Sequence, residues 1–272
     1  MFYPAAYLSR VWMGSNLSSK LLRSTARPLS SHIKLTENCQ ARCISCDYWK
    51  SRWQDHIDTG HAVDLVNQIG AIGIRTLRLT GGESLLRKDV FEILRKADTS
   101  NFKRIIVQTN GLLLKKLHKE VNASPITNVC VSVDGLAQTK DQIRGIRGYF
   151  DLAVEGIKLL RNKRVALSIT LNRMSARELK SLSELARSLG ADVEFNILSR
   201  SLYFLQNADF SSLWPEKSDV AEIVMLLRET AKRPDYEVKY IRQYYSNGDV
   251  AEPPCILGFL QDPGIATVRS SM

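Results

Sequence analysis

Short runs of β-type residues alternate with amphipathic stretches through most of the chain. Between the runs, apolar residues recur at helical spacing, as in Ala62, Leu65, Val66 and Ile69. The six β-type runs are His32–Thr36, Arg75–Thr80, Arg104–Asn110, Asn128–Asp134, Val165–Asn172 and Asp192–Leu198. Such alternation predicts an α/β fold with a parallel sheet, either an open doubly wound sheet or a barrel.

Apolar and polar side chains also alternate within these runs. Because successive side chains of a strand point to opposite faces, the valines of the fourth run oppose the polar set Cys130, Ser132 and Asp134. A parallel sheet covered by helices on both faces would be almost wholly apolar, and a closed eight-stranded barrel fills its interior with branched apolar side chains. The pattern therefore favours a partial (β/α)6-type barrel of parallel strands with outer helices and a polar lumen.

Composition and charge change this picture little. The 272 residues are 44% hydrophobic and 24% charged, as in ordinary globular proteins, and no apolar run is long enough to cross a membrane. The formal net charge is +10, but the basic residues are scattered and do not alternate with aromatic residues. We therefore expect neither a membrane nor a nucleic acid as a partner.

Cysteine usage indicates a reducing compartment. The chain has 5 cysteines, an odd number, and three of them fall within eight residues, which does not suit a disulfide framework. We expect a cytoplasmic protein. The mitochondrial matrix is the minor alternative, because the first 36 residues carry Arg and Lys but no Asp or Glu.

The three clustered cysteines, Cys39, Cys43 and Cys46, follow the first β-type run in a C-x3-C-x2-C spacing. Three thiolates on one loop can bind three irons of a cubane cluster, which leaves the fourth iron to a distant cysteine or a small molecule. A zinc site is the alternative, and it would need a fourth ligand such as Cys255 or a histidine.

With these motifs in place, the chain resembles the radical S-adenosylmethionine (radical SAM) superfamily. The cysteine triplet stands where that family carries its cluster motif, and Thr80-Gly81-Gly82-Glu83 ends the second β-type run like the family's Gly-Gly-Glu motif. The Thr109-Asn110-Gly111 and Ser132-Val133-Asp134-Gly135 turns extend the match over roughly residues 30–200. Ser45 and Ser84 depart from the pattern, since the family usually has an aromatic residue and a proline there.

The resemblance implies a cofactor pair and a reaction. A [4Fe-4S] cluster bound by the three cysteines would hold S-adenosylmethionine on its open iron and cleave it reductively. The resulting 5′-deoxyadenosyl radical would abstract hydrogen from a peptide or from a nucleotide- or sugar-type small molecule in the barrel. An electron donor such as flavodoxin or ferredoxin would reduce the cluster. The alternative is a catalytically inactive iron–sulfur or zinc-binding remnant of such an enzyme.

The resemblance also implies contacts to S-adenosylmethionine. Gly81 and Gly82 would let the backbone approach the ligand closely. The Glu83 carboxylate suits the ligand's ammonium group, and Ser132 is a candidate contact to its methionyl end.

Within the family, the chain looks closest to the group of the molybdenum-cofactor GTP cyclase and the SPASM-twitch enzymes. Arg78 and Thr109 stand where the cyclase holds its nucleotide, so they are candidate substrate-binding residues. His32 replaces an arginine of that group, which counts against the cyclase. Cys255 resembles the opening of an auxiliary-cluster domain that is otherwise missing or truncated, or it is a lone packed cysteine. Cys130 has no evident partner and is expected to pack in the core.

These observations divide the chain into three expected segments. They are a basic N-terminal extension over 1–30, a radical SAM core barrel over 31–235, and a C-terminal extension over 236–272 that is a possible remnant of the auxiliary-cluster domain.

Overall fold

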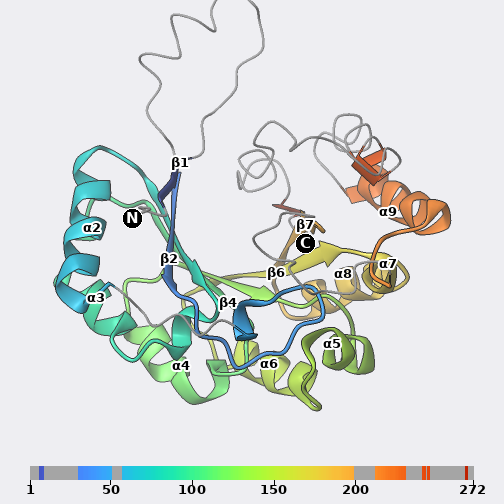
Figure 1. The fold of residues 1–272 in the computed structure, drawn as a ribbon, viewed down its shortest axis with the longest axis horizontal. Helices are drawn as coiled ribbons and strands as arrows, with labels where there is room; N and C mark the ends of the chain where they lie inside the picture. Colours follow the sequence, from blue (N-terminus) through green and yellow to red (C-terminus); the bar gives the residue numbers. More distant parts are fainter. Residues whose placement is uncertain are drawn as a thin grey trace, which may run out of the picture.

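The computed structural model describes residues 6–8, 30–50, 57–198, 212–230, 241–242, 244–245 and 267–268. Six parallel strands form the centre of one sheet (Figure 1). They are β2 (Ser30–Thr36), β3 (Thr76–Gly81), β4 (Arg104–Thr109), β5 (Asn128–Ser132), β6 (Arg164–Leu171) and β7 (Asp192–Ile197). The short strands β1 (Ala6–Leu8) and β8 (Thr267–Val268) pair antiparallel with β2 and β7 at the two edges.

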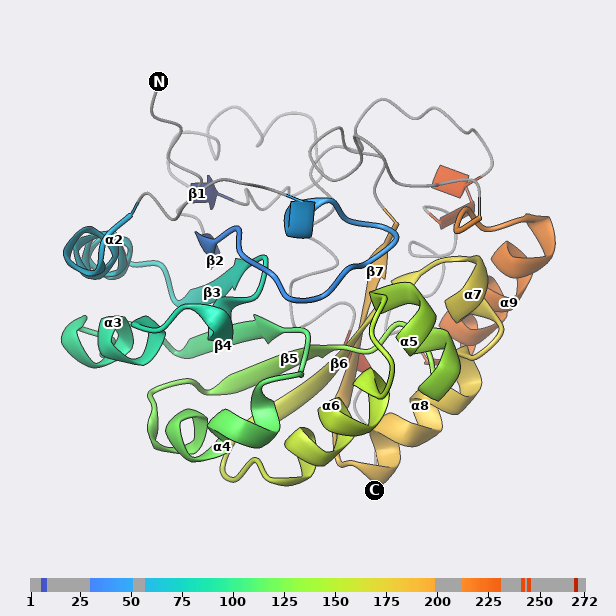
Figure 2. The same ribbon diagram turned by 60° about the horizontal axis from the view of Figure 1, so that its bottom comes forward.

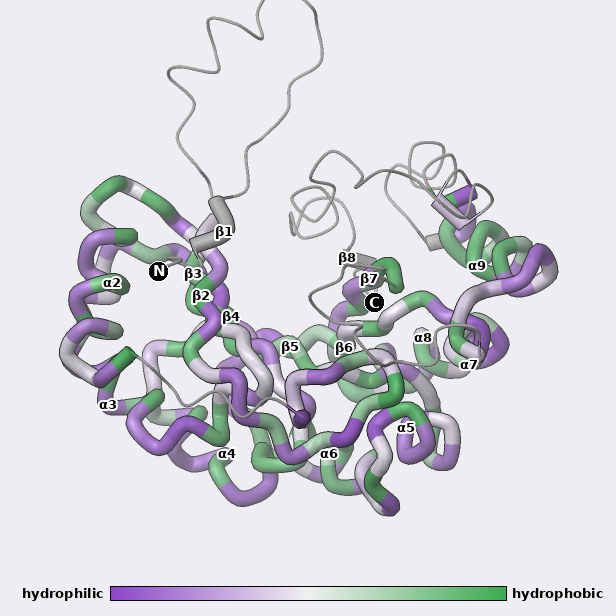
Figure 3. Tube along the Cα trace, in the orientation of Figure 1, coloured by the Kyte–Doolittle hydropathy of each residue, from purple (hydrophilic) through white to green (hydrophobic). Residues whose placement is uncertain are grey.

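Helices cover the outer side of this curved sheet (Figures 1 and 2). They are α2 (Thr59–Ala71), α3 (Val90–Lys96), α4 (Leu114–Ala123), α5 (Ala137–Arg144), α6 (Tyr149–Lys158), α7 (Arg173–Ala176), α8 (Leu179–Ser188) and α9 (Lys217–Thr230), with the 3-10 turns η1 (Tyr48–Lys50) and η2 (Ser84–Leu86). Hydrophobic and hydrophilic stretches alternate along α2, α3 and α4, as amphipathic helices require (Figure 3).

The strands follow one another in sequence order, and among the described residues β1 does not pair with β8, so the sheet stays open. Its outer face is apolar, and Leu77, Leu79, Val129 and Val131 are completely buried there against the helices. The partial barrel expected from the alternation of side chains is therefore confirmed. Burial of the outer apolar set drives the sheet against its helices, which leaves the polar set on the inner face.

The observed strands agree with the expected runs to within two residues. Strands β4 to β7 each end one or two residues earlier than expected, and side-chain contacts lie just beyond the ends of β4 and β5. The Asn110 amide leaves β4 to donate to the Glu83 carboxylate, at 2.7 Å. Asp134, beyond the end of β5, accepts the Thr170 amide of β6 at 2.8 Å. Both departures lie at the carboxyl ends of the strands, where parallel α/β folds bind their ligands.

A bidentate ion pair crosses the inner face from β3 to β7. Arg78 Nη1 and Nη2 each lie 2.9 Å from one carboxylate oxygen of Glu194, and both side chains are almost fully buried. Cys130 Sγ lies 3.6 Å from Glu194 Oε2 and 3.8 Å from Arg78 Nη1. The expectation that Cys130 has no partner was wrong, because the thiol is a member of this polar group.

His32 lies beside Arg78 in the register of β2 and β3. Burial, and secondarily the Arg78 charge, lower the pKa of His32 to about 4. The imidazole is therefore neutral near pH 7, and Arg78 and Glu194 cancel each other's charge. This part of the inner face is polar without carrying a net charge.

In the part of the chain that the structure describes, no helix is long and apolar enough to span a bilayer. Cys255 lies outside the described residues, as do most of the expected N-terminal and C-terminal extensions.

Candidate functional site

The loop between β2 and η1 brings the three clustered cysteines together. Cys39, Cys43 and Cys46 pack around Ala41 and Tyr149, which are both buried. The Cys46 amide donates to the Cys43 carbonyl at 3.4 Å, and Trp49 Nε1 donates to the same carbonyl at 3.3 Å. These bonds curl the loop so that its three thiols share one partly buried cluster of side chains.

Helix α5 fixes this cysteine loop from the other side. The Arg42 amide donates to the Arg144 carbonyl at 2.9 Å, and the Ile44 amide donates to the Ile143 carbonyl at 3.0 Å. Gly145 ends α5 in the left-handed region with φ of 68°, and a Cβ atom there would lie 2.7 Å from the Arg42 carbonyl oxygen. Glycine is thus required where the helix end meets the loop.

Two polar side chains approach the cysteine sulfurs. Asn110 Nδ2 lies 3.9 Å from Cys39 Sγ, and Arg144 Nη1 lies 3.5 Å from Cys43 Sγ. Burial raises the pKa of the Cys39 thiol, and it raises the pKa of Cys46 to about 11. Without a metal these thiols stay protonated near pH 7, and a bound metal would supply the positive charge that thiolates need.

The donor set suits a cluster better than a single ion. Four irons and four sulfides occupy more space than one zinc ion, and three thiolates match three corners of a cubane. Because a structural zinc site takes four ligands and the loop supplies three thiols, the donor set fits an iron–sulfur cluster better than zinc.

The Gly-Gly-Glu turn after β3 packs against the entry to the cysteine loop. The Gly82 amide donates to the Thr36 carbonyl, and the Glu83 amide donates to the Asn38 carbonyl, both at 2.8 Å. A Cβ atom on Gly82 would lie 2.3 Å from the Asn38 carbonyl oxygen. The glycine allows a close approach, but the backbone that it approaches is that of the chain itself.

Glu83 joins the turn after β3 to the turn after β4. Its carboxylate is completely buried and accepts hydrogen bonds from the Thr109 hydroxyl at 2.8 Å, the Asn110 amide at 2.7 Å and the Leu85 amide at 3.0 Å. Burial raises the pKa of Glu83, while these donors oppose the rise. Thr109 thus donates a hydrogen bond to Glu83. The sequence predicted a ligand contact for Glu83 and a substrate contact for Thr109, but not this hydrogen bond between them.

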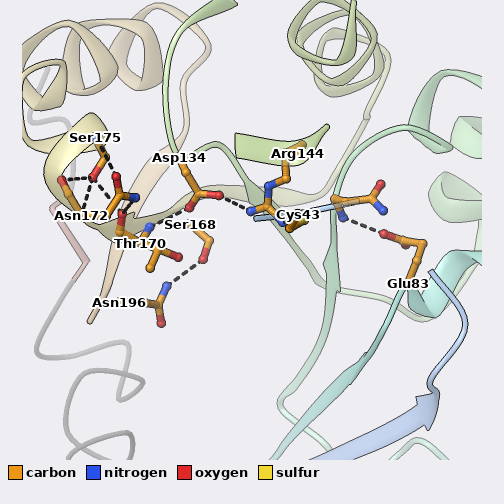
Figure 4. Close-up of polar contacts among 10 residues, drawn as sticks. Cys43, Glu83, Asp134, Arg144, Ser168, Thr170, Asn172, Ser175 and Asn196 are labelled. Carbon is orange, nitrogen blue, oxygen red and sulfur yellow. Dashed lines mark hydrogen bonds and ion pairs between the residues drawn. The ribbon is translucent and has the colours of Figure 1, made fainter. Parts of the chain in front are cut away.

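Ser132 lies at the end of β5, half-buried on the inner face. Its neighbour in register on β6 is Ser168, whose hydroxyl accepts a hydrogen bond from Asn196 Nδ2 at 2.8 Å. A row of uncharged polar groups thus borders the lumen at this end (Figure 4).

Two residues near the cysteines were missed by the sequence reasoning as functional candidates. Arg144 forms an ion pair with Asp134 and also reaches Cys43 (Figure 4). Tyr149 is fully buried among the cysteines. Asp134 was visible on the polar face of its strand, but Arg144 stands on a short helix with no local pattern that indicates its contact.

Comparison with known proteins agrees with this geometry. The model of the radical SAM superfamily matches residues 33–185. The AdoMet-dependent heme synthase of Methanosarcina barkeri is 33% identical over 177 residues, which is 63% of this chain and 50% of that protein. A probable GTP 3′,8-cyclase of Saccharolobus islandicus is 28% identical over 225 residues, covering 80% of this chain and 71% of the relative. The chain spans about half the length of the heme synthase.

Solved structures share the fold. Streptococcus suis SuiB bound to S-adenosylmethionine superimposes with a TM-score of 0.62 at 15% identity, over 89% of this chain and 55% of SuiB. Native anSMEcpe with bound AdoMet gives a TM-score of 0.55 at 18% identity, over 74% of this chain and 60% of that chain. Because the family model covers more than half of the sequence, the chain belongs to the radical SAM superfamily of enzymes, whose cofactors are a [4Fe-4S] cluster and S-adenosylmethionine.

Proposed function

We propose that this chain reductively cleaves S-adenosylmethionine at a [4Fe-4S] cluster bound by Cys39, Cys43 and Cys46, and abstracts hydrogen from a substrate in the polar lumen. The observation that carries the proposal is the gathering of three thiols in one partly buried cluster beside the Gly-Gly-Glu turn, at the carboxyl ends of parallel strands. When bound, the cluster supplies the electron that converts S-adenosylmethionine into methionine and the 5′-deoxyadenosyl radical.

In this proposal the carboxyl ends of the strands form the binding site for S-adenosylmethionine. Gly81, Gly82 and Ser132 are half-buried at the ends of β3 and β5, so their polar groups can border a ligand. For Glu83 we propose a role other than the expected contact to the ligand. Since its carboxylate already accepts three protein donors, we assign it to positioning the turns after β3 and β4 rather than to binding the ligand's ammonium group.

The charge of the lumen bears on the substrate. Arg78 forms a bidentate ion pair with Glu194, so its charge is not free to bind a phosphate. Thr109 is buried, and its hydroxyl already donates to Glu83. We therefore assign both residues to shaping the lumen. Hydroxyls and amides line other parts of the inner face near the strand ends, as at Ser168 and Asn196. Lys34, also near a strand end, pairs with Glu37 at 3.3 Å.

These charged side chains already have partners in the described part of the chain, and a lumen with paired charges and hydrogen-bonding groups suits a peptide or sugar group better than a triphosphate. SuiB has been crystallised with its precursor peptide SuiA, and its structure aligns with 89% of this chain at a TM-score of 0.60. We propose that the reacting part of the substrate is neutral and polar, with a peptide segment as the first class to test.

The reductant in this proposal is a small acidic redox protein of the flavodoxin or ferredoxin type. Arg42 and Trp49 are exposed on the cysteine loop, and Arg147 is exposed on the neighbouring segment after α5. Cations around an aromatic side chain near the cysteines complement an acidic donor and would steer its approach.

Formation of 5′-deoxyadenosine tests the proposed activity. Anaerobically reconstituted protein with dithionite and S-adenosylmethionine is expected to release 5′-deoxyadenosine slowly even without substrate, and not when dithionite is left out. Chromatography with mass detection measures the product. A fully loaded cluster that gives no 5′-deoxyadenosine would contradict the proposal and favour the inactive iron–sulfur remnant.

A further inference from the structure

We propose that Arg144 is a positioning residue that holds the Cys43 thiolate and raises the midpoint reduction potential of the cluster. This inference rests on the proposed function, since it requires a cluster on the three cysteines. The residue belongs to α5, outside the cysteine loop and outside the strand-end turns.

The Arg144 guanidinium is fixed from two sides. One nitrogen, Nη1, lies 3.5 Å from Cys43 Sγ, and the other, Nη2, pairs with Asp134 Oδ2 (Figure 4). Asp134 is itself anchored by the Thr170 amide at 2.8 Å. The Arg144 backbone carbonyl accepts the Arg42 amide, so the same residue holds both the main chain and a sulfur of the cysteine loop.

Asp134 takes only one of the two terminal nitrogens of Arg144, and the other faces Cys43, whereas both terminal nitrogens of Arg78 bond to Glu194. The Arg144 side chain is only 15% exposed, and Asp134 is the carboxylate that pairs with it among the described residues. Three nearby polar atoms, Arg144 Nε, Lys140 Nζ and Tyr149 Oη, are buried without a hydrogen-bond partner in the described part of the chain. Lys140 Nζ lies 4.8 Å from the centre of the Tyr149 ring. This corner between α5 and α6 is therefore rich in donors and poor in acceptors.

Hydrogen-bond donors and a positive charge beside a redox group favour its more negative state. A [4Fe-4S] cluster on three thiolates gains one negative charge when the donor protein delivers one electron. A guanidinium stays charged at every physiological pH, so it stabilises the reduced cluster more than the oxidised one. A hydrogen bond to a ligand sulfur acts in the same direction. Removing Arg144 should therefore make the cluster harder to reduce.

The test is a potentiometric titration of the reconstituted protein without S-adenosylmethionine, followed by the EPR signal of the reduced cluster. In Arg144→Gln we expect the equilibrium constant for reduction to fall at least about tenfold, which is about 59 mV for one electron. Arg147→Gln is the matched control, because that arginine is an exposed cation on the same segment. Its midpoint potential should equal that of the wild type.

Asp134→Asn gives an independent test in the opposite direction, since it removes the counter-charge and keeps the guanidinium. Its midpoint potential should rise. Melting of the cluster-free protein and the iron content show whether Arg144→Gln folds and binds a cluster. If it does not, the midpoint potential of Asp134→Asn alone tests the inference. Loaded variants with the wild-type midpoint, or equal shifts in Arg144→Gln and Arg147→Gln, would overturn the inference. Failure of the wild type to assemble a cluster would instead overturn the proposed function.

Discussion

Replacing Cys43 by alanine is expected to remove the broad brown absorbance of the reconstituted protein and to lower its iron content at least about tenfold. Cys43 is the most buried of the three clustered cysteines, and Arg144 approaches its sulfur. With two thiolates left on the loop, a cubane cluster would lose one of its three protein ligands. Iron and sulfide assays under anaerobic conditions, together with the visible spectrum, measure the loss.

Cys130→Ala is the matched control for this change. Cys130 is also a buried free cysteine, but its thiol contacts Glu194 and Arg78 across the inner face. This variant should keep the full iron content of the wild type. Full iron content in Cys43→Ala, or an equal loss in both variants, would contradict the assignment of Cys43 as a ligand.

Replacing Glu83 by alanine is expected to weaken both the fold and the binding of S-adenosylmethionine. The change leaves the Thr109 hydroxyl and the Asn110 and Leu85 amides without their acceptor in a fully buried place. Each unsatisfied buried group costs about 1–3 kcal/mol, so the free energy of unfolding should fall by several kcal/mol. The loosened turns should lower the affinity for S-adenosylmethionine at least about tenfold, while the cysteines still bind iron.

Denaturant unfolding of the cluster-free protein and calorimetric titration of the loaded protein measure these two effects. Glu155→Ala is the control, because its carboxylate forms an exposed pair with Lys115 at 2.7 Å. Because water and salt screen an exposed pair, it contributes little to stability, and this variant should unfold and bind like the wild type. Unchanged affinity in a folded, loaded Glu83→Ala protein would refute the positioning role of Glu83.

The pH dependence of stability adds a second signature of Glu83. Burial raises the pKa of its carboxyl above the value in the unfolded chain, so the folded state binds the proton more tightly. The contribution of Glu83 to the free energy of unfolding is therefore fully present below the pKa that its carboxyl has in the unfolded chain. It is lost as the pH rises through the pKa that the carboxyl has in the folded state. Glu83→Gln should lack this decline.

Local pattern predicted the fold well because one face of each strand packs against helices. The alternation in residues such as Val129, Cys130 and Val131 separated the outer face from the lumen, and the structure places them accordingly. The C-x3-C-x2-C spacing and the Gly-Gly-Glu turn likewise indicated where the site lies, since both are contiguous in the sequence.

Contacts between distant residues could not be predicted in this way. Arg78 and Glu194 are 116 positions apart, and Arg144 and Cys43 are 101 apart, so no local period relates them. The ligand role of Glu83 was implied by the resemblance to the Gly-Gly-Glu motif, and the local sequence could not show that three protein donors bond to its carboxylate. The sequence therefore did not predict which distant side chains come into contact when the sheet curves.

The most direct test of the account is the EPR spectrum of the anaerobically reconstituted, dithionite-reduced protein with and without S-adenosylmethionine. We expect a [4Fe-4S]⁺ signal that changes shape when S-adenosylmethionine is added, because three cysteines leave one iron open to the ligand. A protein that assembles no cluster, or a cluster whose signal is indifferent to S-adenosylmethionine, would contradict the central claim.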